Sequence, residues 1–586
     1  MGSFFKSFFA SLLALVVFCF LGIIFFIMVI GVFSTEDKPI IANKAVLVLD
    51  MSKPIQERAV EDPFNFIKND VAENIPGLYD IVRMLKYAKN DSHVAGVYIK
   101  CGNNANEMAA NEELRQAIAD FKTADKFVIA YGEVISQGGY YLAQLADKVY
   151  CHPQGGLEWT GFASTNIFIK GLLDKLEIQP QIFYAGKFKS ATEPLRETKM
   201  TDANRLQTSV FLGGMYNQFI QATAMARKLD ADQLKQLAET GAIQTANDAV
   251  KYKLIDGAKY DDEVKTVIAQ KLMIEENSRI NFVTLGEYAA AVNFAQSGTD
   301  KIAVVFADGD IVDGDSEEEQ MVAGDRFRAE LRKARLDESV KAVVLRVNSP
   351  GGSALASDVI WREVSLIKKS KPVVFSMGNY AASGGYYIAA SADYILANPS
   401  TITGSIGVFG IIPNMQSFLK NKLGITTDGV KTAPYADMGN TTRPLTATEA
   451  KFVQNSIDTI YATFKTRVAD GRNLNLQQVD SIAQGRVWTG TDGKKNGLVD
   501  RIGTLQDAVF VAAKLAKLST YGLRELPEQR DFLEQILEAP KKSIKAKAIQ
   551  EEIGLEQWKM LQQAKRLKQI AGVPQARIPF DIMINK

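Results

Sequence analysis

The residues best suited to chemistry lie in a run of small residues between Gly378 and Gly410. Within it, Ser383 stands directly before Gly384 and Gly385, and a segment of helical character follows. A serine at the junction of a loop and a helix lies where backbone N–H groups are free and where the helix dipole favours negative charge. This position suits a nucleophile whose attack creates an oxyanion. A tight packing turn would give the same pattern, so this stretch alone leaves both interpretations open.

A second glycine motif, Asn348-Ser-Pro-Gly-Gly352, follows a predicted buried strand. Open parallel sheets place their ligands at the carboxyl edge, where such a motif would lie. The proline fixes the turn, and the glycines let backbone N–H groups approach a ligand closely. We expect an N–H of Gly351 or Gly352, together with that of Gly384, to form an oxyanion hole. Each donor of such a hole is worth about 3–4 kcal/mol of transition-state stabilisation.

No histidine is an obvious candidate for the base that would activate the serine. The chain has two histidines, His93 and His152, and both are far from Ser383 in sequence. An amine is the remaining common base for a serine. The stretch from Ala185 to Leu195 supplies one candidate, Lys189.

A lysine accepts a proton only when it is neutral. Lowering its pKa from about 10.4 towards 7–8 requires burial worth roughly 3–5 kcal/mol. An apolar cleft beside Phe188, with Ser405 as a second hydroxyl, would suit Lys189 for this role. An ordinary surface lysine is the more common explanation, so spacing alone leaves the role of Lys189 open.

The elements that would position these residues occur twice. A shift of 246 residues superposes the two halves over about 200 residues. Gly138-Gly-Tyr-Tyr-Leu-Ala143 then falls on Gly384-Gly-Tyr-Tyr-Ile-Ala389, and Ala146-Asp147 falls on Ala392-Asp393. A register held for so long indicates an internal duplication.

Each half alternates short Val- and Ile-rich runs with helical patterns. The predicted strands are 45–49, 94–99 and 127–130, then 302–306, 342–347 and 372–376. This alternation predicts parallel strands with right-handed crossovers. We therefore expect two tandem α/β domains, an N-terminal one at 44–295 and a C-terminal one at 300–522.

The halves differ at the positions that would carry the chemistry. The first half has Gln137 in place of Ser383, residues 103–106 in place of Ser349–Gly352, and Trp159 in place of Ser405. The second half has Tyr435 where the first has Lys189. The serine and its oxyanion turn thus remain in one half and the lysine in the other. We predict one composite site that uses both halves.

Residues 8–33 form an apolar run without a charge. As a helix, these residues would be about 39 Å long, which is enough to cross a bilayer. We expect an uncleaved signal anchor there, after a cytoplasmic segment at 1–7, with the body exported.

At the other end, residues 523–586 are charged, helix-prone and interrupted by prolines, which predicts a peripheral helical extension.

The composition of the chain indicates which ligands and partners are not expected. The formal net charge of +1 gives no reason to expect nucleic acid. The three cysteines do not have the spacing of metal ligands, and their number does not indicate a disulfide framework. We expect no metal and no cofactor.

The combined motifs resemble a known family. Ala-Ser383-Gly-Gly-Tyr-Tyr, Thr403-Gly-Ser-Ile-Gly407, the Asn348–Gly352 turn and Gly186-Lys-Phe-Lys-Ser-Ala-Thr-Glu-Pro194 are similar to the long, duplicated signal peptide peptidase A (protease IV) family. The resemblance covers about residues 1–520.

The resemblance implies a fold of the ClpP/crotonase superfamily and a serine–lysine dyad. It implies Ser383 as nucleophile, Lys189 as general base, Ser405 as the residue that orients the amine, and Gly384, Gly351 and Gly352 as oxyanion donors. It also implies a homotetramer on the periplasmic face of the bacterial inner membrane. The implied substrates are hydrophobic peptides, above all signal peptides left after preprotein cleavage.

Two alternatives remain open at this point. A crotonase-type acyl-thioester enzyme would use the same oxyanion turn without covalent serine chemistry. A membrane-anchored scaffold with a dead site would neither react nor turn over substrate. The complete set of Ser383, Lys189 and Ser405 argues against the scaffold.

Overall fold

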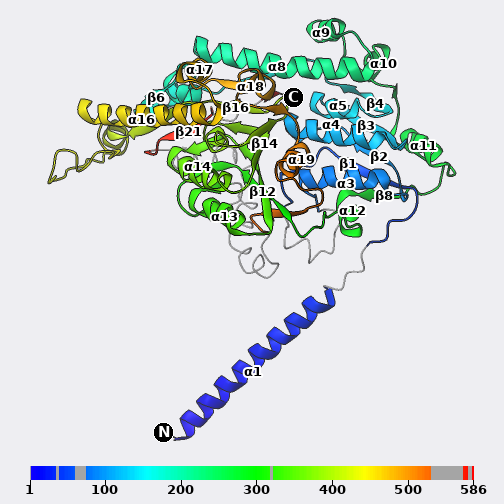
Figure 1. The fold of residues 1–586 in the computed structure, drawn as a ribbon, viewed down its shortest axis with the longest axis horizontal. Coiled ribbons are helices and arrows are strands. Elements are labelled where there is room, and N and C mark those ends of the chain that lie inside the picture. The colour runs from blue at the N-terminus through cyan, green and yellow to red at the C-terminus, as the bar shows by residue number, and fades with distance from the viewer. Residues whose placement is uncertain are drawn as a thin grey trace.

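A computed structural model describes residues 2–33, 39–59, 74–316, 321–528, 572–578 and 584–585. The body contains two α/β halves side by side, the first coloured from blue through cyan to green and the second from green through yellow to orange (Figure 1). Each half is built on a parallel sheet of the same strand order. The tandem α/β prediction is therefore confirmed.

The first-half sheet has the order β7-β4-β3-β2-β1-β8, with every pair parallel. Its strands are β7 (Gly257–Ala258), β4 (Lys148–Leu157), β3 (Phe127–Ile135), β2 (Val94–Lys100), β1 (Ala45–Asp50) and β8 (Phe282–Thr284). The central strands are buried on both faces, as their nearly continuous apolar sequences require.

The second-half sheet repeats this order as β19-β15-β14-β12-β9-β20, again with parallel pairs. Its strands are β19 (Arg501–Ile502), β15 (Tyr394–Ala397), β14 (Val373–Ala382), β12 (Val340–Ser349), β9 (Lys301–Asp308) and β20 (Gly522–Leu526). Two further strands, β16 (Ile402–Gly404) and β18 (Val487–Thr489), extend the end of β14 that carries the candidate serine.

The helices repeat as well. The equivalent pairs are α3 (Leu78–Asn90) with α13 (Gly324–Leu336), α4 (Met108–Lys122) with α14 (Ala354–Lys368), α5 (Gln137–Ala143) with α15 (Gly384–Ala389), α8 (Asp202–Arg227) with α16 (Ala447–Arg472), α9 (Ala231–Glu239) with α17 (Leu476–Ile482), α10 (Ala246–Lys251) with α18 (Gly490–Lys495), and α11 (Asp261–Leu272) with α19 (Leu505–Leu515). The long helices begin alike, because Thr201 and Thr446 each accept an N-terminal N–H of their helix. The first half adds α6 (Lys170–Leu176), α7 (Glu193–Arg196) and α12 (Leu285–Ala291).

A third sheet joins the halves. Its order is β11-β10-β13-β21-β17-β6, and β6 is the member that comes from the first half. The strands are β11 (Met321–Ala323), β10 (Asp310–Val312), β13 (Gly351–Ser353), β21 (Gln575–Arg577), β17 (Val408–Asn414) and β6 (Gln179–Ala185). First-half residues after β6 are thereby fixed against the second half.

A buried ion cluster also connects the halves. Arg346 on β12 lies 2.8 Å from Glu57 and 2.7 Å from Glu113, and both glutamates belong to the first half. All three side chains are almost inaccessible to water. Burial raises the pKa of Glu57 to about 7, against the opposing effect of Arg346. Removing one member would leave an uncompensated buried charge, so the cluster commits the halves to one mutual arrangement.

The C-terminal region differs from the helical extension expected at 523–586. Its described residues form strands instead: β20 completes the second-half sheet, and β21 enters the third sheet. A short strand β22 (Ile584–Asn585) pairs with β5 (Ala163–Ser164) of the first half. Residues 529–571 of the predicted extension lie outside the described residues.

At the N-terminus, α1 (Gly2–Phe33) is one helix that projects from the body (Figure 1). Side chains of residue 23 and residues 25–33, which belong to the predicted anchor, lie outside the described part of the chain. Among the residues that the structure does describe, no helix has the length and hydropathy of a membrane span.

The packing of Glu112 predicts a pH effect on stability. Burial raises its pKa from 4.5 to about 8, although Ser400 N–H and the Gln218 amide donate to it. An unfolded Glu112 would already ionise near its ordinary pKa, so the free energy of unfolding should fall as pH rises from 4.5 through 8. Glu112→Gln should remove part of this loss, on the order of 1–3 kcal/mol.

Urea unfolding at pH 5 and pH 8 measures the effect. The exposed Glu239→Gln serves as the matched control and should leave the pH slope unchanged. A slope that is identical in the wild type and Glu112→Gln would contradict the prediction.

Candidate active site

The structure brings the predicted lysine and serine together. Lys189 Nζ lies 2.7 Å from Ser383 Oγ, although 194 residues separate them in sequence. The same amine lies 3.1 Å from both the hydroxyl and the carbonyl oxygen of Ser405. All three residues are fully buried or nearly so.

Strand pairing explains this proximity. β6 and β17 are antiparallel, and Ala185 at the end of β6 pairs with Val408 at the start of β17. Residues that follow β6 must therefore lie beside residues that precede β17. Lys189 follows β6 and Ser405 precedes β17, so the register of one strand pair delivers the amine to the hydroxyls.

Ser383 occupies a strained turn between β14 and α15. Its backbone has φ 56° and ψ −112°, a conformation that residues with a Cβ rarely adopt. The turn is held because Ser383 N–H donates to Gly404 O at 2.8 Å and Tyr387 N–H donates to Ser383 O at 2.8 Å. Strain of this kind costs on the order of 1–3 kcal/mol and is often found at functional sites.

The loop that carries Lys189 is clamped by the second half. Phe188 N–H donates to Gln484 O at 2.7 Å. Gly485 has φ +75°, and a Cβ there would lie 2.7 Å from Lys189 N, so only glycine allows this approach. The Gln207 amide of α8 donates to Phe188 O at 3.0 Å and to Ser190 Oγ at 2.9 Å.

Burial makes Lys189 a plausible proton acceptor on physical grounds. Desolvation holds the pKa of its amine well below the usual value of 10.5. Ion pairs with a carboxylate would oppose that shift, but the described contacts of the amine are all to oxygens of serines. Lys187, only two residues away, is exposed and lies over the Phe188 ring instead.

The predicted oxyanion glycines lie next to the serine. A Cβ added at Gly351 would lie 2.7 Å from Gly384 N, so the turn at β13 and the start of α15 are in contact. Gly351 N–H donates to Ser349 Oγ at 3.2 Å. Gly352, one residue on, forms part of β13. The structure thus brings all six predicted site residues into one region.

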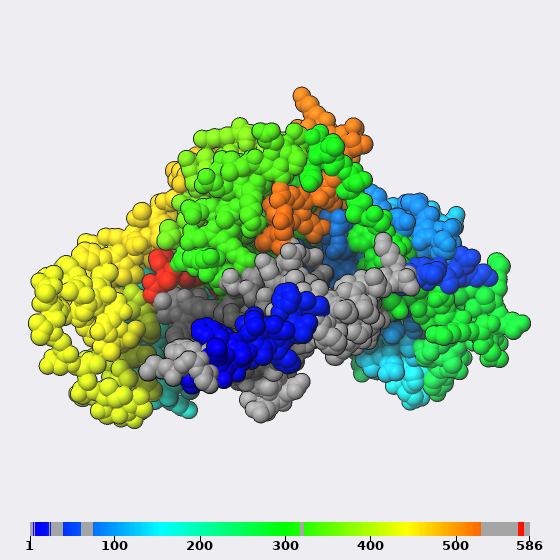
Figure 2. Space-filling model, turned by 90° about the horizontal axis from the view of Figure 1, so that it is seen from below, coloured from blue at the N-terminus to red at the C-terminus, as the bar shows by residue number. Residues whose placement is uncertain are grey.

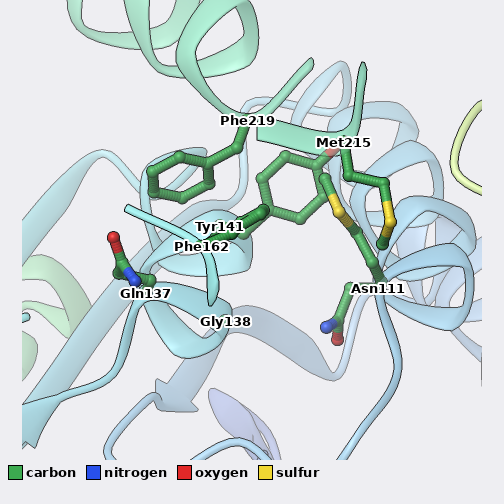
Figure 3. A pocket seen from close by; sticks show the side chains of 8 residues that line it. Asn111, Gln137, Gly138, Tyr141, Phe162, Met215 and Phe219 are labelled. Carbon is green, nitrogen blue, oxygen red and sulfur yellow. The ribbon is translucent and has the colours of Figure 1, made fainter. Parts of the chain in front are cut away.

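The equivalent region of the first half is closed. Gln137 occupies the position of Ser383, and its Oε1 accepts from Thr160 N–H at 3.1 Å and Gly161 N–H at 2.9 Å. Trp159, in the position of Ser405, packs against Tyr140 and donates to Leu234 O. Figure 3 shows what remains, a small pocket with Gln137 at one side, lined largely by the side chains of Met108, Tyr141, Phe162, Met215 and Phe219.

The histidines lie elsewhere. His93 is paired with Asp91, and His152 packs edge-on against Tyr260. Neither contacts a candidate site residue in any described interaction.

Sequence reasoning missed the residues that hold the lysine loop. The Gln207 side-chain amide donates to the loop, whereas Gln484 and Gly485 approach it through their backbone, and such contacts leave no local sequence pattern. Gly407 O, 3.4 Å from Ser383 Oγ, was likewise recognised only as part of a motif.

Comparisons with known proteins show which family the chain belongs to. The model of peptidase family S49 matches residues 120–275 and 365–519, one match in each half. A protein named Protease 4 from Salmonella typhi is 38% identical over 481 residues, which is 80% of this chain and 77% of that protein. Protease 4 of Haemophilus influenzae is 34% identical over 85% of this chain and 83% of its own length. A chloroplastic serine protease SPPA of Arabidopsis thaliana is 31% identical over 74% of this chain and 64% of its own length.

Two α/β halves with a buried serine and lysine at their junction, together with these matches, define the class as a serine peptidase. The chain belongs to peptidase family S49, in the duplicated form of signal peptide peptidase A.

The strained turn predicts an unusual order of stability. Ser383→Gly should be more stable than Ser383→Ala, by about 1–2 kcal/mol, because glycine adopts the native φ and ψ without a Cβ penalty. Thermal unfolding of the two variants measures the difference. Ser376 lies in regular strand β14, so there the order should reverse, with Ser376→Ala the more stable. Equal stability of the two Ser383 variants would contradict the inference that the backbone at Ser383 is strained.

The buried amine predicts that Lys189→Met gains stability while losing activity. The unfolded lysine is charged up to about pH 10.4, whereas burial favours the neutral form in the fold. Folding at neutral pH therefore costs free energy that methionine does not incur. The unfolding midpoint of Lys189→Met should exceed that of the wild type at pH 7, and the gap should narrow as pH approaches 10. A variant less stable than the wild type at pH 7 would contradict the prediction.

Proposed function

We propose that the protein is a membrane-anchored endopeptidase that cleaves hydrophobic peptides, including spent signal peptides, with a Ser383–Lys189 dyad. The observation that carries the proposal is the 2.7 Å contact between the lysine amine and the serine hydroxyl in a buried site. Each partner comes from a different half, so the site requires the whole duplicated chain.

The amine has the contacts that a general base needs. A neutral lysine has one lone pair and two N–H groups. With the lone pair directed to Ser383 O–H, the two N–H groups can donate to the hydroxyl and carbonyl oxygens of Ser405, each 3.1 Å away. Ser405 thus orients the amine, and no carboxylate is needed to do so.

The reaction would proceed through an acyl-enzyme. Lys189 takes the proton of Ser383, and the serine oxygen attacks the peptide carbonyl. Backbone N–H groups of Gly384 and of the Gly351–Gly352 turn stabilise the oxyanion. The lysine then protonates the leaving amine, and water, activated by the same amine, hydrolyses the ester.

Substrate class and location follow from family likeness and from the N-terminal segment. Relatives named signal peptide peptidase and Protease 4 support peptide substrates. The uncharged run at residues 8–33 supports an anchor in the bacterial inner membrane, with the body on the periplasmic side. We further propose a ClpP/crotonase-type fold for each half and a homotetrameric assembly, as the resemblance implies.

Substitution of the dyad tests the proposal. Ser383→Ala and Lys189→Ala should each lower kcat for a fluorogenic apolar peptide by a factor of about 10³ or more. Both variants should keep the circular dichroism spectrum of the wild type. A fluorophosphonate probe should label Ser383 in the wild type and should not label Ser383→Ala.

Lys187→Ala is the matched control, because Lys187 is exposed and two residues from the base. Loss of activity in Lys187→Ala, with Lys189→Ala active, would overturn the assignment of the base. Thioester turnover without labelling of Ser383 would support a crotonase-type enzyme instead.

A further inference from the structure

The pocket of the first half lies at the position where the second half carries its candidate serine. At the shift of 246 residues, Gln137 falls on Ser383 and Gly138 falls on Gly384, and both first-half residues line the pocket. The pocket is therefore the counterpart of the region proposed to receive a peptide in the second half. It has lost the nucleophile but has kept a concave, enclosed surface.

The walls of this pocket are apolar and adaptable. Met108, Met215, Tyr141 and Phe219 line it, and all four side chains are buried. The free space among them is about 10 Å³, roughly what one water molecule needs, so a larger group enters only as side chains move aside. Methionine suits this task, because its three rotatable bonds and polarizable sulfur let it adjust to side chains of different shape.

One polar atom of the pocket lining lacks a partner. Asn111 is 1% exposed, and its Nδ2 donates to Asn106 O at 3.3 Å, which fixes the orientation of the amide. Asn111 Oδ1 is buried and has no hydrogen-bond partner among the described residues. Figure 3 shows Asn111 across the pocket from Gln137. Because a buried acceptor left unpaired is costly, the pocket favours a ligand that brings an N–H or O–H group.

A more open surface leads to the pocket. Phe162 lines the pocket and also an open hollow of about 360 Å³, together with Leu212, Tyr216 and Ala238. The ring of Phe162 is only partly buried and packs against Tyr216 and Phe219. A chain that lies in the hollow can therefore reach the pocket past Phe162.

The helix turn that carries Met108 and Asn111 also packs against the second half. Ala110 N–H donates to Asn379 Oδ1 on β14 at 3.1 Å, and Leu505 N–H donates to Glu113 Oε2 at 3.5 Å. In Figure 2 the orange part of the second half, which includes α19, lies beside blue residues of the first half. The pocket is thus near the junction of the halves, close to the strand that precedes Ser383.

We propose that this pocket is a second, non-catalytic binding site for hydrophobic peptides. An apolar side chain of the peptide lies among the methionines and aromatic rings, and a backbone N–H beside it donates to Asn111 Oδ1. A polar side chain would find no partner among thioethers and rings, so the pocket selects apolar residues. The inference rests on the proposed function only in taking hydrophobic peptides as ligands of this protein.

Methionine signals in the full-length Ser383→Ala protein test the site without hydrolysis. The protein is labelled with ¹³C at the methionine methyl groups and titrated with N-acetyl-leucine methylamide. The signals of Met108 and Met215, assigned with Met108→Leu and Met215→Leu, should shift and reach saturation. Met438 is 44% exposed in the second half and serves as the internal control, so its signal should stay unchanged.

A second probe tests the acceptor. The analogue with both amide nitrogens methylated has no N–H group and should bind about tenfold more weakly. In Asn111→Leu the two probes should bind alike, because no acceptor remains to be satisfied. Asn90→Leu, at an exposed position at the end of α3, is the matched control and should keep the tenfold difference. The comparison of the two probes on the parent protein needs no substitution in the pocket.

The outcomes separate this inference from the proposed function. If Met108 and Met215 do not respond, if Met438 responds equally, or if both probes bind the parent protein alike, the pocket holds solvent only and the inference is overturned. If the signals respond as expected while Ser383→Ala and Lys189→Ala still hydrolyse peptides, the second site is supported and the proposed dyad fails.

Discussion

The rest of the structure depends on one lysine amine that is buried against a serine hydroxyl. Lys189 and Ser383 meet at 2.7 Å inside the junction of the two halves, where the lysine makes its described polar contacts to serine oxygens. Burial disfavours the charged amine, and no carboxylate among these contacts restores it. A surface lysine would remain protonated at neutral pH, so burial at this position is what suits Lys189 to the proposed role of base.

Duplication explains how one chain can build this site from two unequal parts. Both halves keep the same parallel sheet and the same helices, yet each has lost what the other retains. In the first half, Gln137 fills the serine position and bonds to the backbone at residues 160–161. Strand β6 then carries the first half's lysine across to the second half. The buried cluster of Arg346, Glu57 and Glu113 keeps the two halves in the arrangement that this exchange requires.

The third sheet is the place where these features converge. It contains the strand that precedes Lys189, the strand that follows Ser405, the strand with Gly351 and Gly352, and a segment from near the C-terminus. Backbone pairing therefore brings together the loop of Lys189, the segment of Ser405 and the Gly351–Gly352 turn.

The sequence by itself determined the duplication, the two α/β halves and the residues worth testing, because repeated glycine motifs and buried Val-rich strands are local patterns. It also indicated that the serine and lysine lie in different halves. Tertiary structure alone decided that Lys189 rather than Lys187 reaches Ser383, since this depends on the antiparallel register of β6 and β17. The strand pairing of residues 575–577 was likewise hidden from the sequence, because a three-residue strand has no periodicity of its own and forms only against β13 and β17.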